Sequence, residues 1–81
     1  MSEAEANLAA EQRRKTVERL IRESEALEQE GIPGQIVMET MVAMGVTAFV
    51  SVHGKEAAAA VVETLPQRIR EGAFGDLGTL K

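Results

Sequence analysis

Few residues of this 81-residue chain have side chains that could carry out chemistry. It has one histidine, His53, one aspartate, and no cysteine or tyrosine. Catalysis generally needs a nucleophile or an acid–base pair held in a pocket that excludes water. Paired metal sites in helical proteins use Glu-x-x-His motifs, and the sequence contains none. We therefore predict that the chain is not an enzyme and that it holds no metal or other cofactor.

Two titratable residues lie in or beside the most apolar part of the chain. His53 follows this run at the predicted end of a helix, where its protonated form would favour the helix dipole, and this capping role is preferred over a ligand role. Glu39 is the one carboxylate inside the run. It could face a partner or mark an ion path in a membrane, but a position on a polar edge beside Gln35 explains it as well.

Five of the nine basic residues gather near the N-terminus: Arg13, Arg14, Lys15, Arg19 and Arg22. Such a cluster could follow a phosphate backbone, which would make the chain a nucleic-acid-associated regulator. However, Glu residues of opposite charge stand four residues away from most of them, a spacing that stabilises exposed helices. The net charge of −4 also argues against a general polyanion binder. We expect a solvated, self-paired face and predict that nucleic acid is not the main partner.

These residues must be positioned by helices, because turn signals divide the chain into three helical segments. Ser2 and Glu5 have the spacing of a capping box, and Gly31 stands where a left-handed helix end belongs. The first helix is thus expected over residues 2–30. A second should begin at Pro33 or Gly34 and end at His53–Gly54. A third should run from Lys55 to about residue 64, with Pro66 interrupting it before a short helix that ends near residue 72.

The stretch from Ile36 to Val52 is apolar almost all the way around. A helix of this kind must be covered on most sides, and an 81-residue chain has little material to cover it. Residues 46–52 are also rich in β-branched side chains, so a strand paired with another copy is the alternative. A membrane would cover the run too, but Glu39, Thr40, Thr47 and Ser51 lie inside it, and no aromatic belt or asymmetry of basic residues flanks it.

We therefore expect an all-α, three-helix domain over residues 1–72, forming a homodimeric helical bundle, followed by a flexible tail over residues 73–81. The chain has no cysteine and no signal-peptide pattern, so oligomerisation is the expected source of added stability and the cytoplasm the expected location. The predicted dimer contacts are Met38, Met41, Val42, Gly45, Phe49 and Val52. Three methionines at spacing three, Met38, Met41 and Met44, fit core filling or an adaptable binding face.

The tail carries a short motif. Residues 77–81, Leu-Gly-Thr-Leu-Lys, resemble the C-terminal targeting peptide of encapsulin cargo proteins, which reads branched aliphatic, glycine, serine, leucine, basic. Thr79 stands in place of the serine and Leu77 in place of the branched aliphatic residue, while Gly75 replaces an upstream leucine. The resemblance implies a cargo or adaptor protein recruited through this tail. The alternative is a tail whose Phe74 and Leu77 pack back on the helices.

Three functional hypotheses follow. The favoured one is a small non-enzymatic interaction or adaptor module that acts as a homodimer, with residues 2–30 or the tail facing a ligand. The first alternative is the nucleic-acid-associated regulator, and the second is the protein recruited through residues 77–81.

Overall fold

The computed structural model describes residues 2–76, and they form helices with no strand among them. The helices are α1 (Glu3–Gln29), α2 (Gly34–His53), α3 (Lys55–Val62) and α4 (Leu65–Arg70). The predicted all-α class is therefore confirmed. The segment predicted to be interrupted at Pro66 forms the two helices α3 and α4, and α3 ends two residues before the predicted boundary.

Helix α1 has the ends that its sequence predicts. At its start, the Ser2 hydroxyl accepts a hydrogen bond from the Glu5 amide at 3.2 Å. At its end, Gly31 has φ of 95° and its amide bonds the Glu28 carbonyl, while the Ile32 amide bonds the Leu27 carbonyl at 3.2 Å. This pair of bonds is the Schellman pattern, which satisfies helix-end carbonyls and needs a residue with positive φ.

Helix α2 is continuous from Gly34 to His53, and Pro33 is its N-cap. The alternative of a strand over residues 46–52 is wrong, because this whole segment lies within the helix. Gly54 ends α2 with φ of 87° and ψ of 163°, and α3 begins at the next residue. This glycine turns the chain so that α3 packs back against α2.

The chain between α3 and α4 turns at residues 63–64. Pro66 lies in the first turn of α4, where a proline does not remove a needed hydrogen bond. Gly72, with φ of 82°, follows α4, and the Ala73 amide bonds the Arg68 carbonyl at 3.0 Å. The described part of the tail, residues 73–76, has no regular structure.

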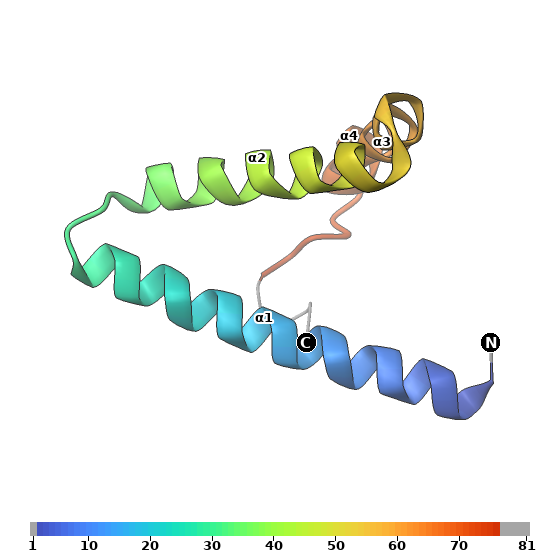
Figure 1. Cartoon of the computed structure of the whole chain (residues 1–81), viewed down its shortest axis with the longest axis horizontal. Coiled ribbons are helices and arrows are strands. Elements are labelled where there is room, and N and C mark those ends of the chain that lie inside the picture. The colour runs from blue at the N-terminus through green and yellow to red at the C-terminus, as the bar shows by residue number, and fades with distance from the viewer. Residues whose placement is uncertain (1, 77–81) are drawn as a thin grey trace.

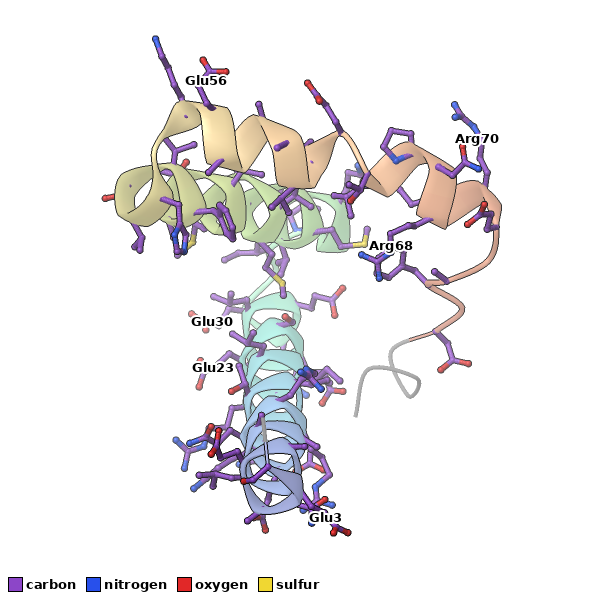
Figure 2. All side chains as sticks on the ribbon, turned by 90° about the vertical axis from the view of Figure 1, so that its right-hand side faces the viewer. Glu3, Glu23, Glu30, Glu56, Arg68 and Arg70 are labelled. Atoms are coloured by element: carbon purple, nitrogen blue, oxygen red, sulfur yellow. The ribbon has the colours of Figure 1, made fainter. Side chains whose placement is uncertain are left out.

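The helices form an open V rather than a closed bundle (Figure 1). Helices α1 and α2 leave the turn at residues 30–33 and diverge, while α3 packs across the C-terminal end of α2 (Figures 1 and 2). Among the described residues only Val37 and Ala58 are buried. Val37 is in α2 near the point of the V, and Ala58 is in α3. The core of the single chain is therefore too small to cover α2.

Candidate functional site

The main candidate site is the apolar surface of α2. Eight of its large apolar side chains are between 38% and 75% exposed: Ile36, Met38, Met41, Val42, Met44, Val46, Val50 and Val52. These side chains point in all directions around the helix, because their positions do not share one helical face. Helix α1 covers α2 near the turn, and α3 covers part of another side. The remaining apolar surface is open to a partner.

The six residues predicted to form a dimer contact lie together on one face of α2. At 100° per residue, Met38, Met41, Val42, Gly45, Phe49 and Val52 fall within about 60° of the direction of Gly45. Val42 and Val52 are 68% and 75% exposed, and Phe49 is half-buried. The structure thus gathers these residues on one accessible face, which we call the Gly45 face.

The contact between α1 and α2 includes a residue that the sequence did not single out as a contact. Ser24 interrupts the apolar stripe of α1, which includes Val17, Leu20, Ile21 and Leu27. Its hydroxyl nevertheless lies 3.4 Å from the Met41 sulfur across the V. The same hydroxyl is 2.8 Å from the Leu20 carbonyl oxygen, to which it donates within its own helix. Because this bond satisfies the hydroxyl, Ser24 can face an apolar neighbour. Val17 and Leu27 on the same side of α1 are half-buried.

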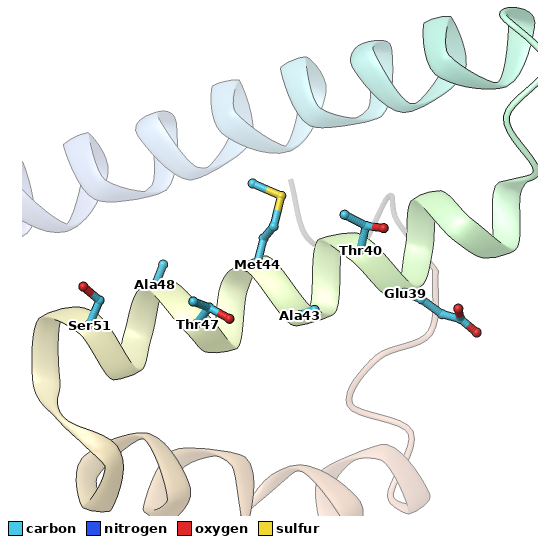
Figure 3. A pocket seen from close by; sticks show the side chains of 7 residues that line it. All are labelled: Glu39, Thr40, Ala43, Met44, Thr47, Ala48 and Ser51. Atoms are coloured by element: carbon cyan, nitrogen blue, oxygen red, sulfur yellow. The ribbon is translucent and has the colours of Figure 1, made fainter.

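A shallow groove runs along α2 on another side of the helix, and Ala48 lies at the border between this groove and the Gly45 face (Figure 3). Its volume is about 600 Å³, and its lining consists of Glu39, Thr40, Ala43, Met44, Thr47, Ala48 and Ser51. Figure 3 shows Met44 pointing toward α1 and Glu39 pointing away from it. Gln35 donates a hydrogen bond to Glu39 at 2.8 Å, so the polar edge predicted for this helix is formed. The lining holds one carboxylate, that of Glu39, and no histidine.

The basic residues of α1 do not form a single patch. Lys15, Arg19 and Arg22 share one side of the helix, because their spacing of four and three residues follows the helical turn. Arg13 and Arg14 point in other directions, and Arg14 lies 3.8 Å from Glu11 in an exposed ion pair. This pair has i,i+3 spacing, in place of the i,i+4 pairs expected from the sequence. A phosphate backbone would meet at most three of the five side chains along one line.

His53 is the last residue of α2, as the sequence predicts. Its ring packs on Phe49, with 4.5 Å between the ring centroids and 41° between the planes. No group of three or more possible metal ligands occurs among residues 2–76. In this structure His53 ends α2 and contacts the Phe49 ring.

The C-terminal region places one aromatic residue against a cation. The Arg68 guanidinium lies 4.9 Å from the centre of the Phe74 ring, within the range of a cation–π contact. Phe74 is thus held against α4, although it is 42% exposed. The predicted targeting motif at residues 77–81 lies outside the described residues.

Helix α2 also meets the length and composition expected of a helix that crosses a membrane, and 6% of that stretch is buried in the structure.

Comparison of the chain with protein families, with characterised proteins and with solved structures finds no match.

Proposed function

We propose that this protein is a small non-enzymatic helical interaction or adaptor module that acts as a homodimer. The observation that carries the proposal is the amount of surface that the single chain exposes. Its accessible area is 6756 Å², whereas a compact monomer of this mass is expected to expose only about 4700 Å². Its radius of gyration is 14.7 Å, against about 12 Å for a compact chain of this length.

The excess of roughly 2000 Å² per chain has the size of a permanent interface. If two copies each covered that much surface, the dimer would bury about 4000 Å² in total, within the range of obligate homodimers. Such interfaces are apolar and resemble a domain core cut in half. The exposed side chains of α2 supply an apolar surface of this kind.

Dimerisation leaves the outer side of α1 available for a ligand. The N-terminal half of α1 extends away from α2 and from the rest of the chain (Figure 1). Its side chains at Leu8, Arg14 and Glu11 are exposed. In this proposal α2 builds the scaffold, and α1 presents charged and small apolar groups to another protein.

The test is the molar mass in solution, measured by light scattering over a hundredfold range of concentration. The chain should have twice its own mass of 8.7 kDa and keep that mass on dilution. Val42→Glu should yield the monomer mass, because Val42 is 68% exposed in the protomer and the charge would enter the interface. Leu8→Glu is the matched control, since Leu8 is 54% exposed on α1 and its replacement should leave the dimer intact.

Two results would overturn the proposal. A monomer with the radius of a compact chain would mean that the V closes on itself. Particles that form only with detergent or lipid vesicles, and whose size follows the detergent, would instead assign α2 to a membrane.

A further inference from the structure

Gly45 is a glycine that its own chain does not need. It lies in the middle of α2 with ordinary helical backbone, whereas Gly31 and Gly54 have positive φ. A Cβ atom built on Gly45 would meet nothing within 4 Å. Glycine in a helix interior is unfavourable relative to alanine. Its remaining advantage is that it lets another backbone come close to α2.

The residues around Gly45 are spaced symmetrically on both sides of it. Going toward the N-terminus, Val42, Met41 and Met38 lie three, four and seven residues away. Going toward the C-terminus, Ala48, Phe49 and Val52 lie at the same three distances. An isologous dimer uses the same patch of both subunits, so a patch symmetric about one residue can pair with itself.

From these observations we propose that the two α2 helices of a dimer pack antiparallel through the Gly45 face, with the two-fold axis passing at Gly45. This inference rests on the proposed function, because it names how the second copy covers α2. The axis brings Met38 opposite Val52 of the second copy, Met41 opposite its Phe49, and Val42 opposite its Ala48. Each of these pairs joins side chains of different size.

The antiparallel direction follows from those pairs and from the helix dipoles. In a parallel pair Met41 would meet Met41 and Ala48 would meet Ala48, so that large side chains crowd at one level and small ones leave a gap at another. Parallel neighbours would also align the helix dipoles side by side, which is unfavourable. The exposed surface of the single chain provides the area that a second copy would cover.

The absence of native cysteine allows a clean crosslinking test in the full-length chain. Met38→Cys and Val52→Cys are prepared separately, mixed, and oxidised mildly. Both side chains are more than half exposed in the protomer, so neither change should disturb its fold. The mixture should give a disulfide-linked heterodimer, and each variant alone should give little. Ile36→Cys is the control, because Ile36 is 52% exposed on the side of α2 opposite Gly45. It should crosslink neither with itself nor with Met38→Cys or Val52→Cys.

A second variant tests the close approach at Gly45. Gly45→Ala should raise the helicity of the protomer but increase the dimer dissociation constant at least tenfold, because the added methyl groups would collide on the axis. Thr47→Ala, two residues along and on the far side of α2, should also favour the helix but leave the dissociation constant unchanged.

The outcomes separate this inference from the proposed function. A dimer that links Met38→Cys to itself, or that links no tested pair, would retain the proposed function and overturn the antiparallel pairing. A dimer that becomes tighter with Gly45→Ala would overturn the close approach of the two α2 helices at Gly45. A monomer by light scattering would overturn both.

Discussion

At the scale of single residues, glycines fix the turns that give this chain its shape. Gly54 has φ of 87° and ψ of 163°, a region of backbone conformation that is essentially limited to glycine. Gly31 has φ of 95° and closes α1 with two helix-end hydrogen bonds. Both were predictable, because each glycine directly follows a long segment with helical patterning.

Gly54 provides a direct test of this backbone role. Gly54→Ala should lower the free energy of unfolding by about 1–3 kcal/mol, because alanine is strained in this conformation. Gly54→Asn should cost a similar amount, since asparagine tolerates the left-handed helical region but not this one. Urea unfolding followed by circular dichroism measures both changes. Wild-type stability in either variant would mean that the α2–α3 turn does not depend on this conformation.

Ser24 shows where residue types alone mislead. In the sequence Ser24 is a polar residue that interrupts the apolar stripe of α1. In the structure the hydroxyl donates to the Leu20 carbonyl and also lies against Met41. A serine that bonds back to its own helix is no longer strongly polar toward its neighbours. A pattern of apolar and polar letters does not contain that information.

At the scale of helices, the sequence predicted both ends of α1 and of α2 to within about one residue. The caps made this possible, because Ser2, Gly31 and Gly54 act locally and need no knowledge of the fold. The β-branched run at residues 46–52 was the ambiguous part. It is helical because it continues an apolar helix of 20 residues, and no other segment among residues 2–76 forms a strand that could pair with it.

The break between α3 and α4 was expected from Pro66, and replacing that residue tests its cause. Proline lacks the amide that would bond the carbonyl four residues earlier, that of Val62, the last residue of α3. Pro66→Ala should therefore let one helix run from Lys55 to Arg70 and increase the ellipticity at 222 nm by an amount equal to a few residues. The free energy of unfolding should rise by up to about 1 kcal/mol.

The comparison for Pro66→Ala is Gln67→Ala, the adjacent position, which should change the ellipticity little because glutamine is already a good helix former. If Pro66→Ala left the ellipticity unchanged, the turn at residues 63–64 would have a different cause. The hydrogen bond that the Thr64 hydroxyl donates to the Val61 carbonyl at 2.7 Å would then be the next feature to remove.

At the scale of the whole molecule, the sequence predicted that α2 needs a cover, and the single chain does not supply one. Only Val37 and Ala58 are buried among residues 2–76, although the chain is 44% hydrophobic. The sequence reasoning could identify the Gly45 face, because the apolar positions near Gly45 follow the helical period. It could not show how far α1 and α2 diverge, since the angle between them depends on contacts in the turn at residues 30–33 and on any partner that packs against the two helices.

If a second copy covers α2, folding and association must be one process. The protomer alone buries too few side chains to be stable, so the dimer should unfold directly to separate chains, and its melting temperature should rise with concentration. Using typical unfolding enthalpies per residue, the increase should be about 4 °C for each tenfold rise in concentration. Differential scanning calorimetry over a hundredfold range measures this shift. Leu8→Glu should show the same dependence, whereas Val42→Glu should melt broadly and independently of concentration. A wild-type melting temperature that stays constant over that range would show that the single chain stabilises its own fold, and that the surface of α2 is kept open for a different partner.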